Sequence, residues 1–248
     1  MTVEWEADSY QRQPLPHQVW GRQVIGRARL VAGESLTDAG CGAGRDAEVA
    51  LGIMRDLAAV AGVEIGQLTL LDSNSSMIES TRERFRNLPD SEKPLIARVD
   101  LLERWPLKGP TDVVISVATI HWIDDHSRFF KRAAEATSPV GRLHVDCGGL
   151  GNILDLSAAA HRLGIDLPNW NFPGVDETVS VLRRSGWVPD NVWLTEDPLR
   201  LPDPVTFREF LRAVVLHGAT PEQLDGMEVE FPDHTVDYVR LNIDAHRA

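Results

Sequence analysis

The chain has 248 residues, of which 43% are hydrophobic and 25% charged, and its formal net charge is −12. These ordinary globular proportions exclude a disordered or fibrous chain, and the excess of acid argues against a nucleic-acid partner. No apolar run has the length of a membrane span, and the acidic first residues do not resemble a signal peptide. We therefore expect a cytoplasmic protein, monomeric or homodimeric, whose partner is a small molecule rather than a nucleic acid or a membrane.

The motif DAGCGAG stands between a predicted buried strand and a helical pattern. It places Gly40, Gly42 and Gly44 directly after the strand that holds Asp38. Glycine allows a sharp turn and the close approach of a ligand, and the helix that follows would turn its backbone amides toward that ligand. The loop alone fits two kinds of site, because Gly42, Gly44 and Ala47 also satisfy the dinucleotide-binding pattern G-x-G-x-x-A. A methyl-donor site and a dinucleotide site therefore both remain open at this point.

Short apolar runs alternate with helical patterns along the next hundred residues, which is typical of a parallel sheet covered on both faces. The expected strands are 68–73, 95–100, 112–117 and 142–147. The helix after the glycines is expected to pack through the face formed by Val49, Ile53, Leu57 and Val60.

Two further helices have start signals. Ser76 and Glu79 have the spacing of a capping box, so a helix is expected to begin near Ser76 and to bury Met77, Thr81, Phe85 and Leu88. Another is expected to begin at Asp124 or Asp125, to turn Phe129, Ala133 and Thr137 toward the sheet, and to end before Pro139. Later in the chain the patterns predict helices over 154–163 and 176–186 and strands over 191–196 and 236–245.

Aspartates mark the ends of three predicted strands. Asp72 ends the second strand, where a carboxylate can bind the two hydroxyls of a ribose. Asp100 ends the third, where it can accept a hydrogen bond from the amine of adenine. Together with Asp38 they favour a cofactor that contains adenosine.

The fourth predicted strand leads into ISVATIHWIDDH, and with it the sequence resembles class I S-adenosylmethionine-dependent methyltransferases over nearly its whole length. The resemblance is carried by DAGCGAG, LLDSNSSMI, VDL, HWIDDH and GRLHVDCGGLGNI. Within the class the chain is most similar to the trans-aconitate methyltransferase branch, which YQRQPLPHQVWG and VDYVRLNIDAHR also resemble. Two features depart from the pattern: Val140 replaces a usual glycine in SPVGR, and the connection after the first helix is long.

The resemblance implies an α/β fold, in which one Rossmann-like domain spanning 1–248 contains a doubly wound, seven-stranded, mostly parallel sheet. Residues 1–33 would form a lid, and 148–175 and 202–231 would be cap insertions. The implied cofactor is S-adenosyl-L-methionine. The glycine loop would hold its methionine part, the second strand its ribose, the third its adenine and the fourth its sulfonium. The residues expected around the cofactor are Asp38, Gly40, Cys41, Gly42, Gly44, Asp72, Ser73, Met77, Asp100, Leu101, Val117 and Ala118.

On the acceptor side, His121 is the expected catalytic residue, because it follows the fourth strand at the mouth of the cofactor site. The side chains expected to contact the acceptor are Tyr10, His17, Trp20, His121, Trp122 and Trp170, with Phe172 beside them. Each has a plainer alternative as a core or surface residue. His144 is expected in the core, and Cys41 and Cys147 as buried reduced thiols without a metal.

These patterns predict methyl transfer to a small molecule, with an oxygen of a carboxylate or hydroxyl as the preferred acceptor. Two alternatives remain. The protein could bind S-adenosylmethionine without transferring methyl, as a cyclase or a regulatory protein. It could also be a nicotinamide-dependent oxidoreductase, as the dinucleotide pattern would allow.

Overall fold

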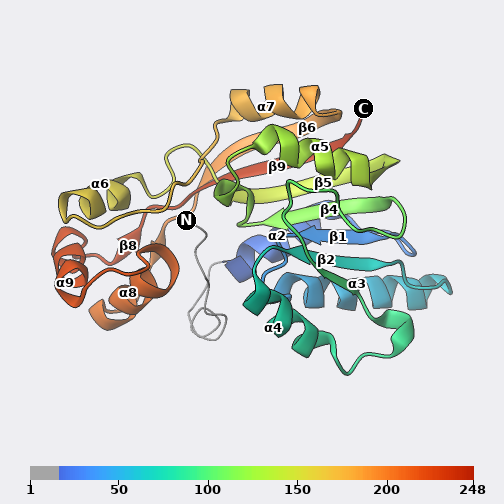
Figure 1. The fold of residues 1–248 in the computed structure, drawn as a ribbon, viewed down its shortest axis with the longest axis horizontal. Helices are drawn as coiled ribbons and strands as arrows, with labels where there is room; N and C mark the ends of the chain where they lie inside the picture. The colour runs from blue at the N-terminus through green and yellow to red at the C-terminus, as the bar shows by residue number, and fades with distance from the viewer. Residues whose placement is uncertain (1–16) are drawn as a thin grey trace.

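The structure is a computed structural model that describes residues 17–248. A seven-stranded sheet in the order β3-β2-β1-β4-β5-β9-β6 runs through its centre (Figure 1). Strands β1 to β5 are parallel, and β9 runs antiparallel between β5 and β6. The bounds are β1 (Leu36–Ala39), β2 (Leu68–Asp72), β3 (Leu95–Arg98), β4 (Thr111–Val117), β5 (Thr137–Gly148), β6 (Trp187–Glu196) and β9 (Val239–Arg247). The predicted fold class is confirmed.

Helices cover both faces of this sheet. Helices α2 (His17–Ala28), α3 (Arg45–Ala61) and α4 (Ser75–Phe85) contribute to one apolar core, and α5 (His126–Ala136) and α7 (Val175–Arg184) to a second. Short 3-10 turns lie at η1 (Asp90–Glu92) and η2 (Ile120–Trp122). The two cores hold the sheet between them, as expected for a doubly wound fold.

A cap of smaller elements extends the first core. It contains α6 (Leu154–Arg162), the hairpin of β7 (Leu199–Arg200) and β8 (Thr235–Val236), α8 (Pro204–Phe210), the π-helical turn η3 (Leu211–Val215) and α9 (Pro221–Glu230). These elements follow β5 and β6 and precede β9, so they lie at the carboxyl-terminal end of the parallel strands, on the left of Figure 1. Ligands of doubly wound sheets bind at this end.

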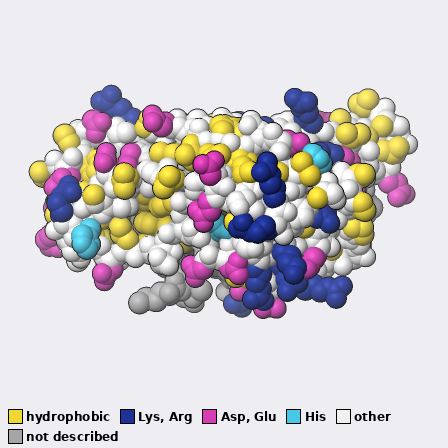
Figure 2. All heavy atoms as spheres, turned by 90° about the horizontal axis from the view of Figure 1, so that it is seen from above, with side chains coloured by type: hydrophobic (Ala, Val, Ile, Leu, Met, Phe, Trp, Pro, Cys, Tyr) yellow, Lys and Arg dark blue, Asp and Glu magenta, His cyan; other side chains and the backbone are white. Residues whose placement is uncertain are grey.

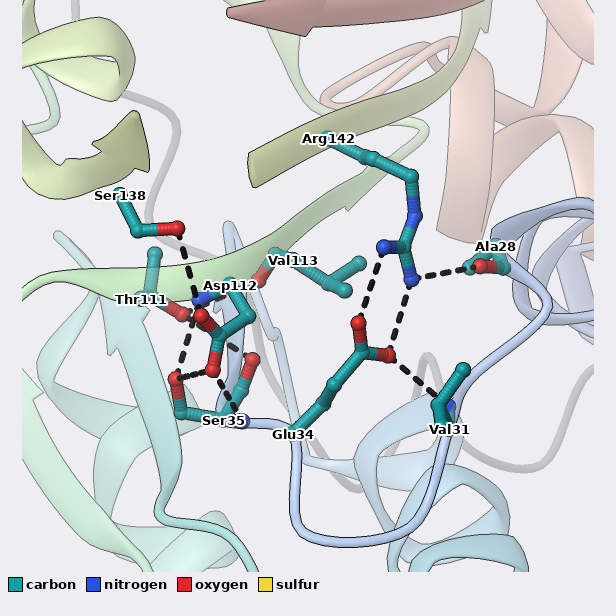
Figure 3. Close-up of polar contacts among 9 residues, drawn as sticks. All are labelled: Ala28, Val31, Glu34, Ser35, Thr111, Asp112, Val113, Ser138 and Arg142. Carbon is teal, nitrogen blue, oxygen red and sulfur yellow. Dashed lines mark hydrogen bonds and ion pairs between the residues drawn. The ribbon is translucent and has the colours of Figure 1, made fainter. Parts of the chain in front are cut away.

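The opposite end of the sheet is fastened by two polar clusters (Figure 3). The carboxylate of Asp112 accepts bonds from the backbone and hydroxyl of Ser35 and from the hydroxyl of Ser138. Arg142 donates from two nitrogens to the two carboxylate oxygens of Glu34, each at 2.9 Å. The clusters connect β4 and β5 to the start of β1 at the amino-terminal end of the strands. The loops that can bind a ligand lie at the other, carboxyl-terminal end.

The packing face of α3 differs from the expected one. Val60 is 90% exposed and Ile53 38%, while the residues that α3 buries are Ala47, Ala50, Leu51, Met54 and Ala58. The small side chains of the alanines let α3 lie close to its neighbours. The larger apolar residues that the sequence pattern placed on the packing face, such as Ile53 and Val60, lie outside that face. Spacing alone identified the helix but not its inward side.

Three element boundaries also differ. Asn74, not Ser76, caps α4: its side-chain oxygen accepts the amide of Met77 at 3.1 Å, and the hydroxyl of Ser76 donates to the same oxygen. Asp125, one of the two predicted starts, caps α5, and the helix ends before Pro139 as predicted, but Thr137 begins β5 instead of belonging to the helix. The last predicted strand is divided into β8 and β9.

The expectations for the cysteines and for His144 are confirmed. Both cysteines and His144 are buried, and the cysteines are free thiols. Within residues 17–248 no helix has the length and apolarity to cross a membrane. On the face that Figure 2 shows, Lys and Arg side chains are mixed with Asp and Glu, so neither sign of charge covers that face alone.

Candidate functional site

The glycine loop turns away from β1 at the carboxyl-terminal end of the sheet. The amides of Gly40 and Cys41 both donate to the carbonyl of Leu71 in β2, at 2.7 and 2.9 Å. Gly40, Gly42 and Gly44 have φ angles of +89°, +52° and +76°, which L side chains rarely adopt. The loop is therefore held against β2 in a backbone conformation that favours glycine at all three positions.

The three glycines differ in what surrounds them. A Cβ at Gly40 would overlap the side chain of Thr119, and one at Gly44 would lie 2.9 Å from Phe85. A Cβ at Gly42 would meet no atom within 4 Å. Gly40 and Gly44 are thus required by close packing, whereas Gly42 leaves its backbone open to the space above the loop.

Asp72 lies directly beside this open backbone. Its Oδ2 accepts the amide of Gly42 at 2.9 Å, and its Oδ1 accepts the amide of Asn74 at 2.8 Å. Burial raises the pKa of the carboxyl group, and these backbone bonds oppose the rise. Each oxygen keeps a further lone pair, so the carboxylate can fix the loop and still accept hydrogen bonds from a ligand.

Asp38 lies within β1 and is buried below the loop. Burial raises the pKa of its carboxyl well above the usual range, with Asp46 and Asp72 adding to the rise. Burial also raises the pKa of the Cys41 thiol. The thiol therefore stays protonated and packs against the loop, and it does not act as a nucleophile. The carboxyls of Asp46 and Asp72 lie close enough to raise the pKa of Asp38, and a cationic group bound nearby would oppose that rise.

The predicted adenine side is more open. Asp100 is exposed, lies two residues beyond the end of β3, and accepts the amide of Leu102 at 2.9 Å. The side chains of Leu101 and Met77 are buried, and Ser73 is exposed next to Asp72. Asp100 thus forms a local turn, and its bond to an adenine remains a prediction.

The backbone changes direction sharply where β4 ends. Ala118, the residue after Val117, has a φ of +52°, and its amide donates to the carbonyl of Asp146 in β5 at 2.7 Å. A non-glycine residue in this region is strained, and such strain concentrates at functional sites. The hydroxyl of Thr119 contacts the carbonyls of Val117 and Gly40 at 2.9 and 3.2 Å. Thr119 thereby joins the glycine loop to the end of β4, a role that its sequence context does not indicate.

Four predicted acceptor-side residues come together as an aromatic cluster. The ring of His121 lies 5.6 Å from that of Trp122 and 5.8 Å from that of Phe172, and Trp170 stacks on Phe172 at 5.8 Å. Two backbone segments that are far apart in the sequence are joined here, because the amide of Asn171 donates to the carbonyl of His121. The cluster extends from the end of β4 to the segment between α6 and α7.

His121 also has a defined hydrogen-bonding role. Its Nδ1 accepts the amide of Gly148 at 3.3 Å, which places the proton of the neutral ring on Nε2. In this tautomer Nε2 can donate a hydrogen bond to an oxygen. It cannot accept a proton there, and this argues against the role of general base that a histidine at the site would suggest.

The remaining predicted acceptor residues are on or before α2. Tyr10 and the side chain of His17 lie outside the described residues. Trp20 is 1% exposed, its ring lies edge-on to Tyr238 at 5.2 Å, and its Nε1 donates to Asp197. Trp20 is therefore mainly a packed core residue, as its plainer interpretation states.

A buried ion pair beside Trp20 was not expected from the sequence. Arg240 and Asp146 are 3% and 2% exposed, and Nε and Nη2 of the arginine both donate to Oδ1 of the aspartate. The guanidinium lies 3.7 Å from the centroid of the Trp20 ring. Because Asp146 also holds the amide of Ala118, the pair supports the end of β4. Within residues 17–248 no group of three or more potential metal ligands is found.

Comparison with known proteins agrees with this arrangement. Residues 37–143 match a family described as a methyltransferase domain. Trans-aconitate 2-methyltransferase of Acidovorax sp. (strain JS42) is 25% identical over 142 residues, which are 57% of this chain and 49% of that protein. The chain thus aligns with about half the length of this relative. An uncharacterized methyltransferase of Schizosaccharomyces pombe is 26% identical over 86% of this chain and 81% of its own length.

Solved structures show the same fold. Geranyl diphosphate C-methyltransferase from Streptomyces coelicolor A3(2) has a TM-score of 0.61 at 14% identity, covering 93% of this chain and 76% of that one. The YcgJ protein from Bacillus subtilis has a TM-score of 0.67 at 13% identity, covering 93% and 99%. The fold, the glycine loop and the match over residues 37–143 together support a class I S-adenosylmethionine-dependent methyltransferase domain. Within that class the chain is similar in sequence to proteins named trans-aconitate 2-methyltransferase.

Proposed function

We propose that the protein transfers a methyl group from S-adenosylmethionine to an oxygen of a small organic molecule. The observation that carries this proposal is the open backbone at Gly42 beside the carboxylate of Asp72. A ligand that places a ribose diol on Asp72 and a cationic end over the acidic loop would complement both features.

Different residues would hold the different parts of the cofactor. Asp72 would accept the ribose hydroxyls, Asp100 and Leu101 would lie beside the adenine, and the glycine loop above Asp38 would face the methionine part. The bound cofactor supplies a methyl group on a positively charged sulfur, which is already activated for displacement. The strained end of β4 at Val117 and Ala118 would position the reacting carbon.

The acceptor would lie against the aromatic cluster of His121, Trp122, Trp170 and Phe172. Nδ1 of His121 accepts the amide of Gly148 and is therefore not available as a base, which supports an acceptor oxygen that is already ionised. An in-line displacement by a carboxylate needs no base, so positioning supplies most of the catalysis. Similarity to relatives named trans-aconitate 2-methyltransferase also favours a carboxylate acceptor.

The proposal is tested by incubating the protein with S-adenosylmethionine and three matched sets of acceptors: small carboxylic acids including trans-aconitate, their alcohols and their amines. The readout is formation of S-adenosylhomocysteine together with the mass of the methylated product. We expect methyl esters from one or more acids and no turnover of the amines. Cofactor binding without product from any set would contradict transfer to these acceptors, and amine methylation would contradict the choice of oxygen.

A further inference from the structure

A cavity of about 560 Å³ lies beside α2, over strands β5, β9 and β6. It is bounded by α2 residues, by Asp146 and Arg240, and by Trp193, Thr195 and Asn242. Its volume is in the range of small-molecule sites. Asp72, Asp100 and the glycine loop are not among its lining residues, so the cavity is separate from the proposed cofactor site.

The cavity remains open because of a glycine inside a helix. Gly26 lies in the last turn of α2, two residues before its end, where alanine would favour the helix more than glycine does. A Cβ at Gly26 would meet no atom within 4 Å and would point into open space, so packing does not require glycine there. The missing side chain leaves room in the cavity at a cost to the helix.

The lining has more cationic groups than carboxylates. Arg27, Arg29 and Arg240 face it with Asp146 and Asp197. Two of the guanidinium groups are placed by indole rings, Arg240 over Trp20 at 3.7 Å and Arg27 near Trp193 at 5.1 Å. Arg27 also pairs with Asp244, and Arg240 with Asp146, so Arg29 is the lining cation without an ion pair among the described residues.

Guanidinium donors remain available in the cavity. Arg240 uses Nε and Nη2 on Asp146 and makes no bond from Nη1 to a described residue. Arg29 is exposed and forms no ion pair within the described part of the chain. Asp146 accepts both bonds from Arg240 at Oδ1, and Asp197 accepts Nε1 of Trp20 at Oδ2. The guanidinium nitrogens of Arg29 and Nη1 of Arg240 suit a ligand that carries a negative charge.

We propose that this α2 cavity binds a small organic carboxylate, whose anionic group lies between Arg29 and the Nη1 edge of Arg240. Its apolar body lies over Gly26 and against Trp193. If the ligand is the acceptor, the inference rests on the proposed function and places the acceptor beside α2 instead of against the aromatic cluster. Otherwise the ligand is a separate metabolite that binds without reacting. The chemistry of recognition is the same in both cases.

The test uses the whole protein and two leucine substitutions. Gly26→Leu fills the cavity, whereas Gly52→Leu is the matched control, because Gly52 also lies inside a helix, α3, with no atom within 4 Å of its Cβ position. Trans-aconitate, succinate and cinnamate are titrated by calorimetry, with cinnamamide as the uncharged counterpart of cinnamate.

We expect at least one of the carboxylates to bind the wild type and Gly52→Leu with equal affinity, and Gly26→Leu to bind it at least about tenfold more weakly. Arg29→Gln should also weaken binding severalfold, and cinnamamide should bind more weakly than cinnamate. The proposal is overturned if none of the acids binds up to about 10 mM, or if Gly26→Leu and Gly52→Leu bind alike.

Two further measurements separate the sources of the ligand and guard against misfolding. Gly26→Leu should bind S-adenosylhomocysteine as the wild type does, which shows that a lost carboxylate site is not a lost fold. If the bound acid is methylated and Gly26→Leu raises its KM, the cavity takes the acceptor. If the acid binds and is recovered unchanged, the cavity takes a separate metabolite.

Discussion

Replacing Asp72 by alanine should weaken cofactor binding and loosen the glycine loop at the same time. The carboxylate accepts two backbone amides, at 2.9 Å from Gly42 and 2.8 Å from Asn74, and bonds to a charged group contribute about 1.5–3 kcal/mol each. The Asn74 amide can turn to water near the surface, so we expect the free energy of unfolding to fall by about 2–3 kcal/mol. Loss of the bonds to the ribose diol should separately weaken binding by about 1.5–3 kcal/mol, or about 10–150-fold.

The two effects are measured apart. Urea denaturation without ligand gives the stability of Asp72→Ala, and calorimetric titration with S-adenosylhomocysteine well below the unfolding temperature gives its affinity. Glu79→Gln, which removes an exposed carboxylate on the neighbouring helix α4, is the control and should change neither quantity. Wild-type affinity in Asp72→Ala would refute the assignment of the ribose, and unchanged stability would refute its role in the loop.

Three other predictions follow from the buried groups and the loop. Arg240→Met leaves Asp146 as an uncompensated buried charge and should lower the free energy of unfolding by about 3–5 kcal/mol. Adding Asp146→Asn should recover part of this loss. A change below about 1 kcal/mol in urea denaturation would contradict the prediction. Burial, with Asp146 adding to it, raises the pKa of Asp46 from 3.8 to about 6, so the carboxyl holds its proton more tightly in the folded protein. The contribution of Asp46 to the free energy of unfolding should therefore fall by on the order of 3 kcal/mol as the pH rises from 3.8 to about 6. Asp46→Asn should become more stable relative to the wild type over that interval. A difference in the free energy of unfolding between the two proteins that does not change with pH would contradict this. Gly40→Ala should mainly lose thermal stability, because its Cβ has no room, whereas Gly42→Ala should mainly lose affinity for S-adenosylhomocysteine; the reverse order would contradict the open position of Gly42.

The order and type of the main elements could be predicted because they depend on local patterns. The alternation of apolar runs and helical periods identified the parallel sheet, and α5 was expected to begin at Asp124 or Asp125, of which Asp125 caps it. The buried side of α3 could not be predicted, because helix packing through alanines gives a weaker hydrophobic signal than Ile53 and Val60, which are exposed.

The candidate site shows the same limit. The glycines and Asp72 could be found because motif and position at a strand end coincide in the sequence. Arg240 and Asp146 could not be paired, because they lie 94 residues apart and meet only through the antiparallel register of β5 and β9. The protonated nitrogen of His121 depends on a backbone amide of Gly148, and no sequence pattern carries that information.

Calorimetric titration of the purified protein with S-adenosylmethionine, S-adenosylhomocysteine and NAD tests the central claim most directly. The match of residues 37–143 to a methyltransferase domain, together with the open backbone at Gly42 and the carboxylate of Asp72, predicts micromolar binding of the first two ligands and no binding of NAD. Binding of NAD alone would contradict the assignment of the glycine loop and, with it, the proposed methyl transfer.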